Sequence, residues 1–166
     1  MPKIALAAMF AATLFGLCRV PAHGQGAAPA AAPAAPTGKA AYWPNSDLQS
    51  TWKDLEARQV INKRVMEGGA YSINIRIVKK GDAPLVHARS CDVWVVQAGT
   101  ATAITGGSLD NGKKRPNVDD IAGTGITGGT EQALKAGDIL YVPPGVPHGF
   151  KDVKGFRAFL IRFDTK

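Results

Sequence analysis

The spacing of apolar residues changes from a helical to a strand-like period near Tyr71. Before that point, Leu48, Trp52 and Leu55 follow each other at intervals of four and three residues, which places them on one face of a helix. Residues 46–49, Ser-Asp-Leu-Gln, fit a capping box at its start. We therefore predict a short helix that packs on the outside of the domain that follows.

Beyond this helix, apolar and polar residues alternate with a period of two, which is typical of a half-buried strand. Residues 72–78, SINIRIV, place three isoleucines on one face. Arg76 lies on the opposite face of the same strand. We expect its side chain to be in solvent, and the alternative is an anion anchor inside a barrel.

The rest of the domain contains short segments rich in β-branched and aromatic residues, among them 86–104, 139–142 and 157–163. Glycine and proline separate these segments, with turn signals at 88–90 and near Gly99. Roughly seven short strands after a single helix favour an antiparallel sandwich or barrel. The predicted fold class is therefore all-β, with a short N-terminal helix.

Residues 106–130 are rich in glycine and poor in apolar side chains, so we predict a long surface loop there. Within it, residues 123–128, GTGITG, match the glycine spacing of a dinucleotide-binding motif. That motif requires a preceding strand and a following helix. Here a polar segment precedes it and a turn follows, so we interpret the glycines as turns of the loop.

The N-terminus has the layout of a secretory signal peptide, with a short basic start, the apolar run 4–18 and small residues after it. Cleavage after Gly24 gives a signal peptide of residues 1–24, and cleavage after Ala22 is the alternative. A lipoprotein signal ending at Cys18 is disfavoured by the bulky leucine before it. Residues 25–41, rich in alanine and proline, are predicted to be an extended linker, and residues 42–166 the domain. We expect a periplasmic or secreted protein.

Removal of residues 1–24 lowers the formal net charge from +7 to +5, because 18 basic and 13 acidic residues remain. The basic residues form no stripe, and the densest run, 113–116, is predicted to be a solvated loop, so nucleic acid is not an expected partner. No second apolar run approaches the length of a membrane span. Cys91 is then the single remaining cysteine, so no intrachain disulfide is expected.

Two histidines remain after signal removal, His87 and His148, and each stands at the start of a predicted strand. Asp92 follows His87 by five residues, and strict alternation would place the two on opposite faces. The turn at 88–90 absorbs one residue and returns both to the same face. Two imidazoles and a carboxylate on one inner face would suit Zn, Fe, Mn or Ni, or would form a buried hydrogen-bond network.

The segment 137–148 resembles the second sequence motif of the cupins, loosely G-D-x4-P-x-G-x2-H. Gly137-Asp138, Pro143, Gly145 and His148 match it position for position. The resemblance extends over about 70–163. It implies a small antiparallel, jelly-roll-like β-barrel, often dimeric, so we expect a homodimer.

The first cupin motif, loosely H-x-H-x(3,4)-E-x6-G, is matched only in part. His87 takes the place of its second histidine, Asp92 that of its glutamate and Gly99 that of its glycine, whereas Leu85 stands where the first histidine is expected. In many cupins these residues hold a divalent metal at the barrel centre. The resemblance thus implies a metal site made of His87, Asp92 and His148, with open positions for water or substrate.

Three hypotheses of function follow from this reading. The first is a metal-dependent enzyme that acts on a small molecule, the second a metal-free protein that binds a small ligand, and the third a structural role with a filled barrel. We expect Trp94 and Phe150 to be core residues, and Cys91 to point away from the cavity. Tyr141 is a weak candidate for a proton donor.

Overall fold

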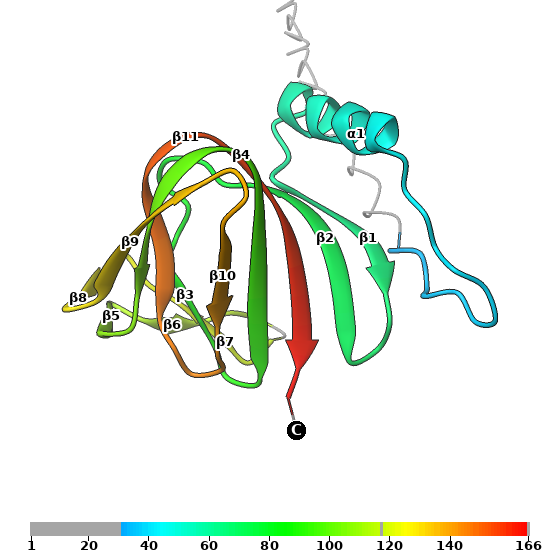
Figure 1. The fold of residues 1–166 in the computed structure, drawn as a ribbon. Helices are drawn as coiled ribbons and strands as arrows, with labels where there is room; N and C mark the ends of the chain where they lie inside the picture. Colours follow the sequence, from blue (N-terminus) through cyan, green and yellow to red (C-terminus); the bar gives the residue numbers. More distant parts are fainter. Residues whose placement is uncertain (1–30, 117, 166) are drawn as a thin grey trace, which may run out of the picture. The chain divides into compact units, whose positions relative to one another are not determined.

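A computed structural model describes residues 31–116 and 118–165 (Figure 1). The predicted signal peptide, residues 1–24, lies outside the described residues, as does the first part of the predicted linker. In the rest of that linker, Pro33 and Ala35 form backbone hydrogen bonds with Glu67, and the chain bends at 37–39. None of the helices in the described ranges has the length and hydropathy needed to cross a membrane.

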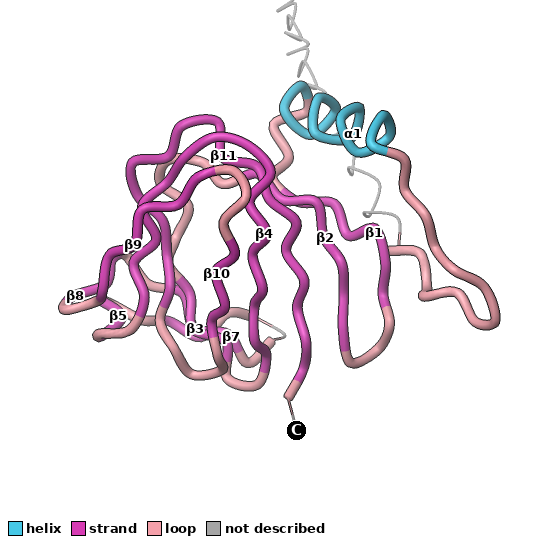
Figure 2. Tube along the Cα trace, viewed as in Figure 1, coloured by secondary structure: helices cyan, strands magenta, loops and turns pink. Residues whose placement is uncertain are grey.

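The described residues form one helix and eleven strands, and every strand pair is antiparallel (Figures 1 and 2). This confirms the predicted all-β antiparallel barrel with a short N-terminal helix. The elements are α1 (Asn45–Ala57), β1 (Asn62–Glu67), β2 (Tyr71–Ile77), β3 (Leu85–His87), β4 (Ser90–Thr105), β5 (Ser108–Asp110), β6 (Lys113–Lys114), β7 (Asp120–Ala122), β8 (Gly125–Thr127), β9 (Thr130–Lys135), β10 (Ile139–Val142) and β11 (His148–Asp164).

The two longest strands, β4 and β11, pair along most of their length and form the spine of the barrel. A turn was predicted at Gly99, but β4 continues through this position. Gly99 has a φ of 72°, and a Cβ atom there would collide with the carbonyl oxygen of Gly155 on β11. Glycine therefore allows the two strands to bend together at close approach without ending the ladder.

Helix α1 packs on the outer face of β2, as predicted. Trp52 and Leu55 are buried against Ile75, and the Trp52 ring lies 5.3 Å from that of Phe159 on β11. The predicted capping box is wrong, because the helix begins at Asn45 after Pro44 and no side chain caps it. Proline fixes φ near the helical value and lacks an N–H, so it starts a helix without a capping hydroxyl.

The glycine-rich segment 106–130 is not one long loop. It contains the four short strands β5, β6, β7 and β8, and the predicted turns of 123–128 include β8, which pairs with β5. Of these strands, β7 matters most for the candidate site. It pairs with β3 in a register that sets Asp120 opposite His87. The sequence offered little signal for these strands because each has only two or three residues.

The barrel core contains Trp94, Val96 and Leu160, with Phe150 packed against it. The ring of Trp94 meets that of Phe150 edge-on at 4.8 Å, so both predicted core residues are confirmed. Cys91 is buried as a free thiol. The inward face of β4 therefore runs from a polar end at Asp92 to an apolar end at Val96.

Candidate metal centre

His87, Asp92 and His148 lie together at the polar end of the barrel. The Nε2 atom of His87 is 3.3 Å from Oδ2 of Asp92, and the Nε2 atom of His148 is 3.5 Å from the same oxygen. All three side chains are buried. The convergence expected from the turn at 88–90 is thus present, and the role of the three residues as metal ligands stays a prediction.

The ring orientation of both histidines is fixed by a contact at Nδ1, the nitrogen that does not face Asp92. Nδ1 of His87 lies 2.7 Å from Oδ1 of Asp120, and Nδ1 of His148 lies 3.2 Å from the carbonyl oxygen of Val146. Because a carboxylate and a carbonyl accept hydrogen bonds, each Nδ1 carries a proton, and in the neutral imidazole Nε2 then carries the lone pair. Both lone pairs belong to the atoms nearest Asp92.

These distances suit a metal ion. Four ligands at about 2.1 Å from a tetrahedral ion are separated by about 3.4 Å, close to the two separations measured here. The carboxylate of Asp120 behind His87 is the kind of outer partner that usually fixes the tautomer of a metal-binding histidine. The donor set of His87, Asp92 and His148 therefore fits a divalent ion that accepts nitrogen and oxygen ligands.

A fourth side chain, Arg162 of β11, also reaches this group. Its Nε atom donates to Oδ1 of Asp92 at 2.6 Å, and Nη2 donates to Oδ2 at 2.9 Å. The same Nη2 lies 2.8 Å from Nε2 of His87. Arg162 and Asp92 are direct partners in the β4–β11 register, so the two strands place the guanidinium beside the carboxylate.

Charge and burial act in opposite directions on Asp92. Burial alone would raise the pKa of this carboxyl, but the neighbouring side chains of His148, His87 and Arg162 outweigh that effect and hold its pKa well below the usual range. Of the three, Arg162 is the one that donates hydrogen bonds to Asp92. Burial likewise lowers the pKa of Arg162, and its hydrogen bonds with Asp92 more than offset this, so the pKa is raised. Asp92 and Arg162 therefore form a buried ion pair.

A cavity of about 360 Å³ adjoins the site. Its lining combines Asp92, His148 and Arg162 with the apolar surfaces of Leu85 and Trp94. Nε1 of Trp94 is buried and has no hydrogen-bond partner among the described residues. The complete lining is Ile61, Asn62, Arg64, Arg76, Val78, Asp82, Ala83, Leu85, Asp92, Trp94, Arg115, His148, Gly149, Phe150, Leu160 and Arg162.

Arg76 lines this cavity, so the expectation that its side chain is in solvent is wrong. It is 17% exposed and forms an ion pair with Asp82 at 3.2 Å, and its Nη1 donates to the carbonyl oxygen of Ile61. Burial lowers the pKa of Arg76, the charge of Asp82 opposes this, and that of Arg162 adds to it. The alternation of β2 was right, but helix α1 covers its apolar face and leaves the polar face to the barrel interior.

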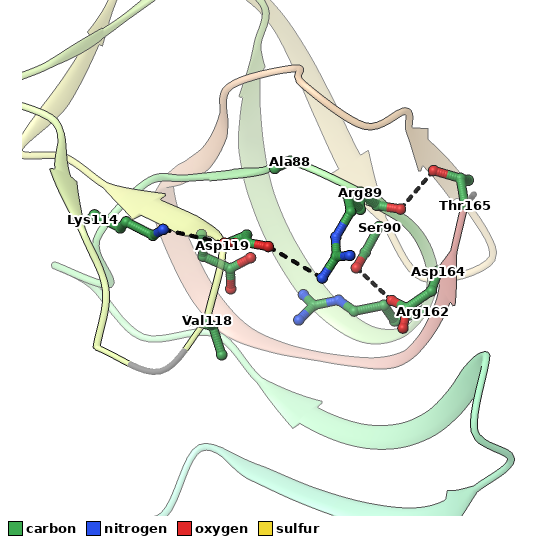
Figure 3. Close-up of a pocket in the computed structure, with 10 residues that line it drawn as sticks. Ala88, Arg89, Ser90, Lys114, Val118, Asp119, Arg162, Asp164 and Thr165 are labelled. Carbon is green, nitrogen blue, oxygen red and sulfur yellow. Dashed lines mark hydrogen bonds and ion pairs between the residues drawn. The ribbon is translucent and has the colours of Figure 1, made fainter.

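A second cavity, of about 630 Å³, opens on the other side of Arg162 (Figure 3). Asp119 pairs there with Arg89 at 3.1 Å and with Lys114 at 3.2 Å. Figure 3 shows Arg162 extending from β11 into the space beside Arg89. Since Asp92 and His148 line only the smaller cavity, Arg162 stands between the candidate metal ligands and this second opening.

Two residues of the site were missed in the sequence, Arg162 and Asp120. For Arg162 the alternation was misleading, because it lies opposite Phe159, Ile161 and Phe163, on the face that the sequence alone would assign to solvent. Asp120 carried no signal, since its strand is three residues long. Tyr141 is 58% exposed and lines neither cavity, so it has no place in the site.

Comparison with known families agrees with this architecture. A family model described as the JmjC domain matches residues 54–154, which is more than half of the chain. The chain therefore belongs to this cupin-like family. The cupin resemblance drawn from 137–148 is confirmed. No curated protein matches the chain.

Three solved structures are similar to this chain at low sequence identity. A protein from Bacillus halodurans is 10% identical over 78% of this chain and 86% of its own, with a TM-score of 0.50. A double-stranded β-helix protein from Klebsiella pneumoniae is 23% identical over 64% and 73%, with a TM-score of 0.46. A Cupin 2 conserved barrel domain protein from Salinispora arenicola is 17% identical over 62% and 74%, with a TM-score of 0.42.

The buried ion pair leads to a prediction on stability. Asp92→Asn should lower the free energy of unfolding by about 2 kcal/mol, because it removes the charge-assisted hydrogen bonds of the partly buried guanidinium of Arg162. Urea denaturation in the presence of a chelator measures this without any contribution from metal. As a control, Asp54→Asn removes an exposed ion pair with Arg58 and should cost about 1 kcal/mol or less. Equal costs for the two variants would contradict the prediction.

Proposed function

Because the chain belongs to a cupin-like family, we propose that it binds a divalent metal ion through His87, Asp92 and His148 and binds or acts on a small molecule in the adjoining cavity. Zn, Fe, Mn and Ni are the candidate ions. The observation that carries the proposal is the arrangement of the two imidazoles. Each is held at Nδ1 by an acceptor, and each directs the Nε2 lone pair towards Asp92.

A metal bound by these ligands supplies a Lewis acid or an oxygen-activating centre with positions open to substrate. The protein's own contribution is to hold the ligand side chains in position and to exclude water from the site. Asp120 and the carbonyl oxygen of Val146 fix the imidazoles, and the rings of Trp94 and Phe150 form an apolar wall beside them.

The cavity favours a small molecule with negative charge. Four arginines and only two carboxylates line it. The most buried of these arginines is Arg76, whose ion pair lies away from the candidate metal ligands. Two of its five N–H groups donate to Asp82 and to the carbonyl oxygen of Ile61. Its remaining donors are suited to hydrogen bonds with an anionic group.

A second candidate function is a metal-free protein that binds a small ligand, and the contact of Arg162 with the site favours it. A guanidinium already supplies positive charge to Asp92 and a donor to His87. Asp92 and His87 therefore have a partner within the chain itself, and the barrel needs no metal to balance the buried charge of Asp92.

Asp120 and its neighbour Asp119 provide a matched test of the metal site. We expect chelator-treated protein to bind one ion per chain in calorimetric titrations with Zn²⁺, Mn²⁺ or Ni²⁺. Asp120→Asn should weaken that binding by about 10- to 100-fold, because the amide no longer accepts the Nδ1 proton as a carboxylate does. Asp119→Asn removes the same charge from a residue bound to Arg89 and Lys114, and should leave the affinity unchanged.

His148→Ala and Asp92→Ala should abolish the binding. Leu85→His should tighten it by restoring the histidine of the cupin motif. At a hundredfold excess over its dissociation constant, the metal should add about 2.7 kcal/mol to the free energy of unfolding of the wild type. If wild-type protein binds none of the ions and its melting temperature is indifferent to chelator, the metal proposal is wrong and the metal-free alternative stands.

Export is proposed from the basic start, the apolar run and the small residues of 1–24. N-terminal sequencing of protein recovered from the periplasm or the medium should begin near His23 or Gln25. An intact Met1 on the protein recovered from cells would contradict the proposal.

A homodimer is proposed from the exposed edge of the barrel. Among the described residues, β10 pairs only with β4, and it carries two large exposed apolar side chains, Ile139 and Tyr141, 68% and 58% exposed. Unpaired strand edges are commonly covered by another chain. For the wild type, light scattering should give twice the mass of the mature chain. For the double variant Ile139→Lys, Tyr141→Lys it should give the mass of a single chain. A monomeric wild type over a wide concentration range would refute the dimer.

A further inference from the structure

Arg162 and a bound metal ion require the same lone pair of His87. Nδ1 of this imidazole carries the proton that is donated to Asp120, so the ring has a single lone pair, at Nε2. Nη2 of Arg162 lies 2.8 Å from that atom. One lone pair accepts either an N–H donor or a metal, and the two contacts with His87 exclude each other.

We propose that Arg162 is an internal competitor of the metal, which closes the site by holding Asp92 and His87 and must release His87 before an ion binds. This rests on the proposed metal site. Positive charge strengthens the competition, because a divalent ion close to a buried guanidinium is repelled by it. The metal affinity of the wild type is therefore set partly by a residue that is not a ligand.

The release of His87 does not require the whole ion pair to break. Nε of Arg162 donates to Oδ1 of Asp92 at 2.6 Å, whereas Nη2 contacts Oδ2 and His87. A carboxylate has about four acceptor positions, so Oδ1 can keep a hydrogen bond from Nε while Oδ2 turns to a metal. The planar guanidinium then has to tilt as a unit, so that Nη2 leaves His87 and Oδ2 while Nε stays near Oδ1.

The structure gives Arg162 space for this movement. Its side chain is 25% exposed and lines both cavities, of about 360 and 630 Å³. Nη1 has no hydrogen-bond partner among the described residues, so rotation of the guanidinium costs no further contact there. By contrast His87 and Asp92 are fully enclosed and fixed from several sides. Arg162 is the movable part of the group.

The test compares Zn²⁺ binding by wild type and Arg162→Met, with Arg157→Met as the matched control. Arg157 lies on the same strand, is 26% exposed and pairs with Glu56 on α1. Isothermal titration, or competition with a chromophoric chelator, gives the dissociation constants. We expect Arg162→Met to bind Zn²⁺ at least tenfold more tightly than wild type, and Arg157→Met to match wild type.

A purely structural role for Arg162 makes the opposite forecast. Loss of the ion pair would then lower the melting temperature without metal, and the Zn²⁺ affinity would fall or stay the same. The rise of the melting temperature on Zn²⁺ addition separates the two roles, because it should be larger in Arg162→Met than in wild type only if the guanidinium competes. If the methionine variant does not fold, Arg162→Lys takes its place in the binding test. A lysine has no fork to bridge Asp92 and His87, so it should also bind more tightly than wild type.

Each outcome bears on the two proposals separately. If wild type binds Zn²⁺ and neither Arg162 variant binds it more tightly, the competition is refuted and the metal site stands. If only the Arg162 variants bind, the competition is supported and the wild type is the metal-free protein. If no variant binds Zn²⁺, both proposals fail.

Discussion

The structure depends on one buried carboxylate. Asp92 lies at the inner end of β4 with 1% of its surface exposed, and its low pKa shows that it is ionised there. An isolated charge in such a place would cost far more than a domain of this size has in net stability. The surroundings of Asp92 therefore have to supply positive charge and hydrogen bonds, and the guanidinium of Arg162 supplies both, beside the two imidazoles.

The register of the two long strands explains how this group is assembled. Arg162 faces Asp92 across the β4–β11 ladder, and His148 opens the same strand fourteen residues earlier. A strand of that length reaches the group twice only because it bends with β4, at the close approach of Gly99 to Gly155. A backbone feature in the middle of the ladder thus helps to bring both ends of β11 to one carboxylate.

The sequence predicted the parts of this design that have a period or a motif. The alternation in β2, the apolar stripe of α1 and the Pro-Gly corner before His148 each follow a spacing that one chain displays by itself. The site partners Asp120 and Arg162 do not, because their positions depend on pairing between strands far apart in the chain. The sequence was also insufficient to place Arg76. Its face was assigned correctly, but which face of β2 is covered by α1 is a tertiary property.

Two differences from the cupin motif act on the site in the same direction. Leu85 faces the cavity where the motif has a histidine, so a metal would find one neutral ligand fewer. Arg162 places a positive charge beside Asp92 and His87, so the metal would also meet repulsion and a competitor. Both reduce the advantage of a metal over the guanidinium, while the barrel stays balanced in either state, because Asp92 always has a cation beside it. A ligand with negative charge would shift that balance, since it offers Arg162 another partner within the arginine-lined cavity. The proposed small-molecule and metal sites would therefore be linked through one side chain.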